Sequence, residues 1–169
     1  DALSAPHTTL GGYERDTTPR LAEWAKRATV FSEAFGTSCS TRLSLTAIVT
    51  GHYNAMVRLQ DRKKHPFFYD PSVQTTASML KTLGYHTVHI PGAAYFTSAK
   101  WGGYWGGFDV VDETSHRKGP TPQHSAAEIT NAALDHIDGA KDSAEPLFLW
   151  VHYFDHHHPY ENPKGGKRF

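Results

Sequence analysis

The spacing of apolar residues along the chain predicts four helices. Apolar residues recur at helical spacing after Pro19, and again within residues 41–49, 72–83 and 125–137, which is the repeat of one helix face. The residues that we expect to face inward are Leu21, Trp24, Ala25 and Ala28 on the first helix, Leu45, Ile48 and Val49 on the second, and Val73, Ala77, Leu80 and Leu83 on the third.

Two other segments have the pattern of strands. Residues 85–90 alternate between apolar and polar side chains, and residues 146–153 form a continuous apolar run of the kind buried on both faces of a parallel sheet. Residues 29–34 form a shorter extended segment. Because helices alternate with apolar strands, the chain is predicted to be a layered α/β domain, or part of a larger one.

Composition excludes several classes of function. Lys plus Arg and Asp plus Glu both number 17, so the net charge is zero, and nothing attracts the whole chain to nucleic acid or to a membrane surface. The longest apolar run, residues 147–151, is far shorter than the roughly 20 residues of a membrane span. Cys39 is the single cysteine, so no disulfide can form within the chain.

Polar segments that could carry chemistry follow the predicted strands or precede the predicted helices. In parallel sheets, active residues lie on loops at the carboxyl ends of strands. Residues 1–12, 38–51 and 152–160 are the segments that fit this position. The last of them contains three of the twelve histidines in a row, a composition typical either of metal binding or of a solvated loop.

Five motifs occur along the chain in an order that one known family shares. They are Asp1-Ala2-Leu3-Ser4-Ala5-Pro6-His7, the segment from Thr41 to Thr50-Gly51, Leu83-Gly84-Tyr85-His86-Thr87, Gly107-Phe108-Asp109, and His152-Tyr153-Phe154-Asp155-His156-His157-His158-Pro159-Tyr160. Together they resemble the sulfatase branch of the alkaline phosphatase superfamily. The resemblance implies a three-layer α/β/α sandwich of alkaline-phosphatase type. We expect residues 1–169 to be the amino-terminal portion of a single sulfatase-like catalytic domain, incomplete at both ends.

The family's nucleophile can be placed in two registers. Sulfatases carry a Cys or Ser, oxidised to formylglycine, in the sequence C/S-x-P-S-R, and a Thr-Gly pair follows it. Matching the arginine to Arg42 puts Ser38 at the nucleophile position, whereas matching the pair to Thr50-Gly51 puts Thr41 there. The second register also resembles the phosphoethanolamine transferases, which use a threonine in T-x-x-S. We favour Thr41 because it keeps the nucleophile at a helix N-terminus, where an anion is stabilised.

The Thr41 register departs from the sulfatase pattern. Leu43 and Leu45 then stand where sulfatases have proline and arginine, and Cys39 does not begin the sequence that formylglycine conversion resembles. These departures disfavour formylglycine, and Ser38 remains the alternative nucleophile.

The resemblance implies roles for individual residues. Thr41 would attack the ester and form a covalent intermediate, and Arg42 would neutralise the transferred group. His157 would contact the substrate or protonate the leaving group. Asp1 and Thr41 would bind one divalent metal ion (Ca, Mg, Mn and Zn are not distinguished), with the other ligands supplied by later segments. The substrate-side residues would be His152, Asp155 and Lys100.

The predicted function is therefore a metal-dependent, sulfatase-like hydrolysis of sulfate or phosphate esters, acting outside the cytoplasm as the family usually does. The substrate would be a small-molecule, glycan or lipid ester, and nucleic acid is not an expected partner. Two alternatives remain open: a phosphoethanolamine-type phosphotransferase acting at a membrane surface, and a catalytically silent member that binds an anion or a partner. We expect the 169-residue segment alone to be inactive.

Overall fold

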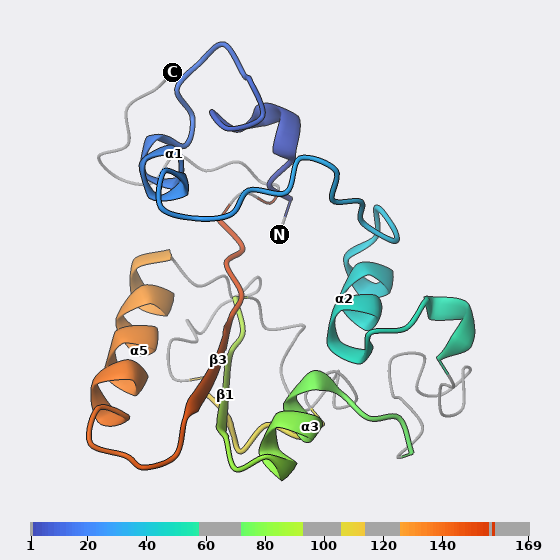
Figure 1. Cartoon of the computed structure of the whole chain (residues 1–169), viewed down its shortest axis with the longest axis vertical. Helices are drawn as coiled ribbons and strands as arrows, with labels where there is room; N and C mark the ends of the chain where they lie inside the picture. The colour runs from blue at the N-terminus through green and yellow to red at the C-terminus, as the bar shows by residue number, and fades with distance from the viewer. Residues whose placement is uncertain (1, 58–71, 93–105, 114–125, 156, 158–169) are drawn as a thin grey trace, which may run out of the picture. The chain divides into compact units, whose positions relative to one another are not determined.

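A computed structural model of the chain describes residues 2–57, 72–92, 106–113, 126–155 and 157, apart from the Arg42 side chain. The chain forms two compact units. One comprises Asp1–Gly36 and His156–Phe169, and the other comprises Thr37–Asp155. Figure 1 labels the α-helices of both units and the strands β1 and β3.

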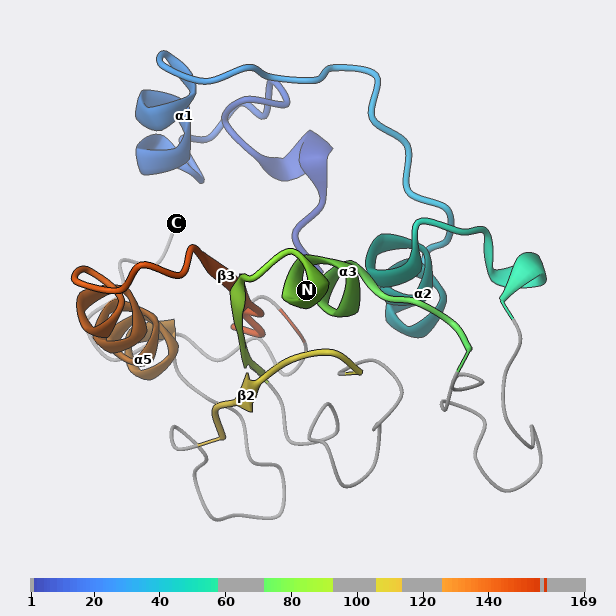
Figure 2. The same cartoon turned by 60° about the horizontal axis from the view of Figure 1, so that its bottom comes forward.

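The larger unit is built on a parallel sheet. Its strands are β1 (His86–Ile90), β2 (Val110–Val111) and β3 (Leu147–Val151), in the order β2-β1-β3. Both neighbours run parallel to β1, with Val88 paired to Val110 on one side and to Leu149 on the other. Figure 2 shows β2 lying beside β1. The prediction of parallel strands within residues 85–90 and 146–153 is confirmed, but the five residues of β3 are half-buried and not buried on both faces as predicted.

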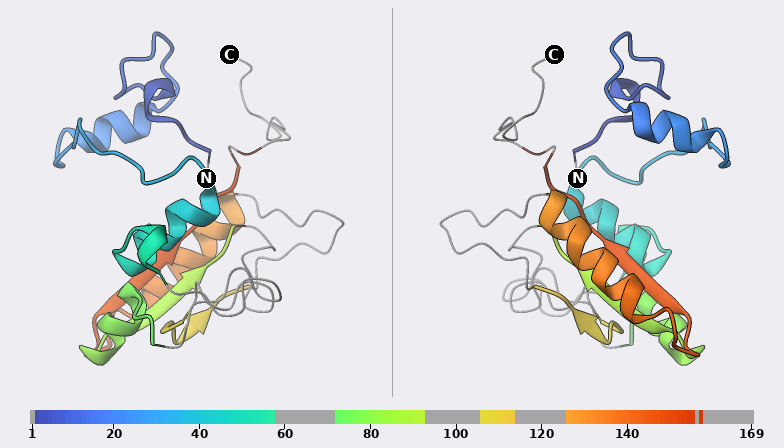
Figure 3. Two further views of the ribbon diagram at one scale, coloured as in Figure 1. Left: turned by 90° about the vertical axis from the view of Figure 1, so that its right-hand side faces the viewer. Right: turned by 90° about the vertical axis from the view of Figure 1, so that its left-hand side faces the viewer.

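Helices lie on both faces of this sheet. α5 (Ala126–Gly139) contacts β1 and β3, and α3 (Thr76–Thr82) contacts β1. α2 (Thr41–Thr50) packs against α3 and against the short 3-10 helix η2 (Asn54–Met56). Figure 3 shows α5 covering one face, with α2 and α3 on the opposite side. The arrangement is an α/β fold with three layers, as predicted.

The two faces of β1 have different characters. Val88 and Ile90 are fully buried against Ile129 and Ala133 of α5 and form the apolar core. The alternate residues Thr87 and His89 are also fully buried but face the other way. Side chains alternate between faces along a strand, so the core that α5 closes is purely apolar, while the opposite layer buries polar groups.

Helix boundaries follow from local signals. α3 begins with a capping box, in which Thr75 Oγ1 accepts from the Ser78 backbone N–H at 3.1 Å and Ser78 Oγ accepts from the Thr75 N–H at 2.8 Å. α2 ends at Gly51, whose φ of 69° favours glycine. The predicted boundaries of the second and fourth helices agree with α2 and α5 within two residues.

In the larger unit, two apolar residues predicted to face inward do not. Ile48 is 57% exposed and Leu83 is 72% exposed. The buried face of α2 differs from the predicted one, and its residues are Leu45, Thr46, Val49 and Thr50. α3 ends at Thr82, so Leu83 lies beyond the last helical turn.

The smaller unit contains η1 (Ala5–His7) and α1 (Pro19–Ala25). Its loop is closed by two reciprocal hydrogen bonds: the Thr9 N–H donates to Thr18 Oγ1 at 3.0 Å, and the Thr18 N–H donates to Thr9 Oγ1 at 2.9 Å. The prediction that Leu21 and Trp24 face inward is wrong, since they are 40% and 60% exposed. The extended segment predicted at residues 29–34 does not pair as a strand. None of the helices within the described ranges has the length and apolar character needed to cross a membrane.

Candidate active site

The carboxyl ends of β1 and β3 lie side by side. The His152 N–H, directly after β3, donates to the carbonyl of Ile90 at 3.0 Å. Gly92 approaches this segment so closely that an added Cβ would lie 2.1 Å from His152 O and 3.1 Å from Phe154 N. Only glycine fits this approach without movement of the backbone. The chain leaving β3 is therefore pressed against the chain leaving β1.

α2 begins at the same end of the larger unit as the ends of β1 and β3 (Figure 1). Ser40 holds the N-cap position with φ of −99°, and Thr41 is the first helical residue. The Thr41 side chain is half-buried. The first backbone N–H groups of a helix have no acceptor within the helix and carry partial positive charge. This start of a helix can stabilise an anion.

Ser38, the alternative nucleophile, lies in the turn before α2. Its hydroxyl accepts from the Ser40 backbone N–H at 3.1 Å, and its carbonyl accepts from Ser44 Oγ at 3.2 Å. The neighbouring Cys39 is exposed. The hydroxyl and the carbonyl of Ser38 thus both take part in the turn that leads into the helix.

Two histidines are buried near the carboxyl edge of the sheet. His89 is fully buried, its Nδ1 lies 3.2 Å from the carbonyl of Trp150, and its ring packs beside Phe108 at 5.5 Å between centroids. Burial lowers the pKa of His89 to about 3. His152 is 8% exposed, and burial lowers its pKa to about 4. Both rings are therefore neutral at pH 7.

Asp155 has a structural partner. Its Oδ1 accepts from the backbone N–H of Ala126 at 2.9 Å, and Ala126 is the first residue of α5. A carboxylate at this point satisfies a donor that the helix cannot pair internally, and it interacts favourably with the helix dipole. The sequence did not indicate this contact, because the two residues are far apart along the chain.

Other predicted site residues are described only in part or not at all. Asp1 and Lys100 lie outside the described residues, and Arg42 is placed only as the second residue of α2. His157 is half-buried and belongs to the smaller unit. Within the described ranges no group of three or more His, Cys, Asp or Glu side chains is arranged to hold a metal ion. Thr41 is thus the one predicted metal ligand whose side chain is described, and the described residues do not form a metal site by themselves.

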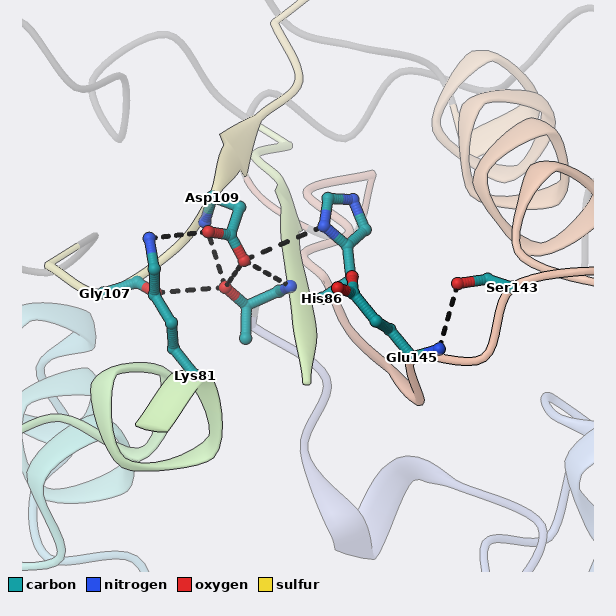
Figure 4. A network of polar contacts seen from close by, with 7 residues as sticks. Lys81, His86, Gly107, Asp109, Ser143 and Glu145 are labelled. Carbon is teal, nitrogen blue, oxygen red and sulfur yellow. Dashed lines mark hydrogen bonds and ion pairs between the residues drawn. The ribbon is translucent and has the colours of Figure 1, made fainter. Parts of the chain in front are cut away.

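A second polar cluster lies at the opposite, amino end of the strands (Figure 4). Asp109 pairs with Lys81 at 2.6 Å, and its other oxygen accepts from the Thr87 N–H at 2.9 Å. His86 Nδ1 lies 3.8 Å from the same carboxylate. The Lys81 contact and the Thr87 hydrogen bonds lower the pKa of Asp109 to about 2. This cluster joins α3, β1 and the start of β2, and it gives the Gly107-Phe108-Asp109 motif a structural role.

Comparison with solved structures shows the same fold in longer proteins. The chain superposes on a protein in the alkaline phosphatase superfamily from Vibrio parahaemolyticus with a TM-score of 0.75 and 25% identity, covering 99% of this chain and 41% of that protein. BT4656, solved with its substrate D-glucosamine-2-N,6-O-disulfate, gives a TM-score of 0.71 at 16% identity, with 96% of this chain and 34% of BT4656 covered. A protein of the glycosaminoglycan metabolism locus of Bacteroides thetaiotaomicron gives 0.63 at 14% identity, covering 95% and 43%.

The chain thus spans less than half the length of each of these three structures. Comparison with curated proteins gave no match. The family model described as Sulfatase matches residues 1–167, almost the whole of the sequence. The chain belongs to the sulfatase family.

Proposed function

We propose that this chain is the amino-terminal portion of a metal-dependent enzyme that hydrolyses sulfate or phosphate esters through a covalent intermediate on Thr41. The observation that carries the proposal is the start of α2. In a chain of the sulfatase family, this helix begins at Thr41, at the end of the unit where β1 and β3 end (Figure 1). Anionic ligands of parallel α/β folds bind at this edge and at helix N-termini.

In this proposal Thr41 loses its hydroxyl proton to solvent, and its oxygen attacks sulfur or phosphorus while the bond to the ester oxygen breaks. The leaving oxygen takes a proton from His157. Water then attacks the sulfur or phosphorus of the intermediate and returns a proton to His157, and the Thr41 oxygen leaves and takes a proton from solvent, so that sulfate or phosphate is released. The N–H groups in the first turn of α2 and the guanidinium of Arg42 would stabilise the charge on the transferred group. This assignment needs no formylglycine, in keeping with Leu43 and Leu45 after Thr41.

The metal would be held by Asp1 and by Thr41, with further ligands from outside this chain. A bound divalent ion supplies Lewis-acid chemistry that lowers the pKa of a coordinated hydroxyl. On the substrate side, the positive charge of Lys100 would interact with the ester. His152 would act as a neutral hydrogen-bonding group, because burial keeps its pKa at about 4.

The test compares Thr41→Ala with Ser38→Ala in the full-length protein. Suitable substrates are 4-nitrophenyl sulfate, 4-nitrophenyl phosphate and D-glucosamine-2-N,6-O-disulfate, the last because BT4656 was solved with it. We expect Thr41→Ala to lower kcat on the order of 10³-fold or more, as loss of a nucleophile does. Ser38→Ala should stay within about twofold of wild type, because it removes one hydrogen bond of a turn.

Other results would point elsewhere. A large loss in Ser38→Ala together with an active Thr41→Ala would show that the other register is right. Transfer of the phosphoryl group to an added alcohol in preference to water would favour the phosphotransferase. A wild-type protein that binds no metal and turns over none of the three esters would favour the hypothesis of a catalytically silent family member that binds an anion or a partner.

A further inference from the structure

Residues 152–155, which follow β3, are held against the sheet. The His152 N–H donates to Ile90 O at 3.0 Å, and the His152 backbone lies in contact with Gly92. His152 and Phe154 are 8% and 4% exposed. One side of this short segment is therefore fixed by the end of β1 and by burial of alternate side chains.

The intervening side chains hold the same segment to α5. Tyr153 OH lies 2.9 Å from Thr130 Oγ1, one turn into the helix. Asp155 Oδ1 accepts from the Ala126 N–H at 2.9 Å, at the first residue of the helix. Residues on the two sides of the segment are thus attached to two different elements, and Asp155 is the last of these three attached residues along the chain, two positions before His157.

We propose that Asp155 is a positioning residue: by capping α5 it fixes the point from which the chain continues to His157. The inference rests on the proposed function, in which His157 serves the substrate. It replaces the expectation that Asp155 binds the substrate. Sulfate and phosphate esters are anions, and a second anion at contact distance would repel them, whereas the positive end of a helix attracts a carboxylate.

The experiment measures kcat and KM of full-length Asp155→Ala and Asp155→Asn on 4-nitrophenyl sulfate and 4-nitrophenyl phosphate. Loss of the cap in Asp155→Ala should lower kcat on the order of 10²-fold, because a small displacement of a catalytic group has effects of this size. KM should change by less than about twofold, because no substrate contact is lost. The amide oxygen of Asp155→Asn can still accept the Ala126 N–H, so this variant should recover most of kcat.

Asp138→Ala is the matched control. Asp138 is an exposed aspartate at the other end of α5, where it pairs with Lys141 at 2.6 Å. This variant should leave both kinetic constants at the wild-type value. In a His157→Gln background, adding Asp155→Ala should lower kcat no further, since groups that act through one another are not additive.

Several results would overturn the inference. A rise in KM in both Asp155 variants with kcat unchanged would mean that the carboxylate contacts the substrate. Full activity in Asp155→Ala would mean that the cap does not position the segment. Hydrogen exchange separates these failures from failure of the proposed function, because Asp155→Ala should speed exchange in the first turn of α5 even in an inactive protein. Unchanged exchange there would show that the cap itself is wrong.

Discussion

The two ends of the sheet are stabilised in opposite ways. At the amino end, charged side chains meet on the surface: Lys81 pairs with Asp109, with the two side chains 52% and 26% exposed. Near the carboxyl end, His89 and His152 are buried and neutral, with pKa values of about 3 and 4. Solvent and salt weaken the exposed ion pair. The buried histidines at the carboxyl end are destabilised when they are protonated, and the packing around them is destabilised when a larger side chain is introduced. We therefore expect the carboxyl end to be the more sensitive one.

Acid gives the largest expected difference between the two ends. The folded-state pKa of each buried histidine lies below the ordinary value of 6.5. Their contribution to stability is complete above pH 6.5 and is lost as the pH falls toward 4 and 3. The free energy of unfolding of the full-length protein should fall by about 5 kcal/mol between pH 7 and pH 4, measured by urea titration.

A substitution checks the origin of this acid sensitivity. His89→Gln removes one titrating ring and should reduce the decline by about half. An unchanged decline in His89→Gln would show that the buried histidines do not cause it.

Two glycines give the next largest effect and separate stability from activity. At the carboxyl end, Gly92→Ala would bring a Cβ to 2.1 Å from His152 O. At the amino end, Gly107→Ala would bring one to 2.3 Å from Ser78 N, at a φ of +97°. Each should lower the free energy of unfolding by about 3 kcal/mol, since the backbone must move. Only Gly92→Ala should also lower kcat of the folded enzyme, by about 10²-fold.

Gly84→Ala is the control for these two variants. Gly84 also has a positive φ, +84°, but an added Cβ would meet nothing within 4 Å. Gly84→Ala should lower the free energy of unfolding by about 1 kcal/mol, because alanine disfavours a positive φ, and it should leave kcat unchanged. Equal losses of kcat in Gly92→Ala and Gly107→Ala would remove the functional distinction between the two ends.

The ion pair at the amino end gives the smallest effect. Lys81→Ala should lower the free energy of unfolding by only about 0.5 kcal/mol, because the lysine is exposed, and less in high salt. Asp109→Ala should have a larger effect, about 2 kcal/mol, because the Thr87 N–H loses its acceptor. Thermal unfolding at low and high salt measures both. A loss in Lys81→Ala as large as that in Gly107→Ala would mean that charge, not packing, stabilises this end.

Sequence periodicity predicted β1, β3 and the long helix α5 well, because each repeats its pattern over several residues, but it did not indicate the two-residue strand β2. It failed at Leu21, Trp24, Ile48 and Leu83, which are exposed. Periodicity shows that a helix has an apolar face, but the residues that the face finally buries depend on the neighbouring elements. Residues distant in sequence determine which part of the face is buried, and a local pattern carries no information about those residues.

The candidate site likewise contains features that the local sequence predicts and features that depend on distant contacts. The start of α2 at Thr41 could be predicted from local sequence, since a helix pattern and a Thr-Gly pair mark its length. The role of Asp155 could not, because its partner Ala126 belongs to the start of another element. The neutral state of His89 depends on burial beside Phe108 and Trp150, which the sheet brings together. Burial by tertiary contacts is the part of the site chemistry that the sequence did not contain.

The most direct measurement is to trap the covalent intermediate. Full-length protein is incubated with 4-nitrophenyl phosphate and with 4-nitrophenyl sulfate, quenched in acid and mapped by mass spectrometry of the peptide that contains Ser38 and Thr41. A phosphoryl or sulfuryl group on Thr41, absent from Thr41→Ala, is the expected result. An adduct on Ser38, a formylglycine at residue 38 or 39, or an active enzyme with no adduct on this peptide would contradict the assignment of Thr41 as the nucleophile.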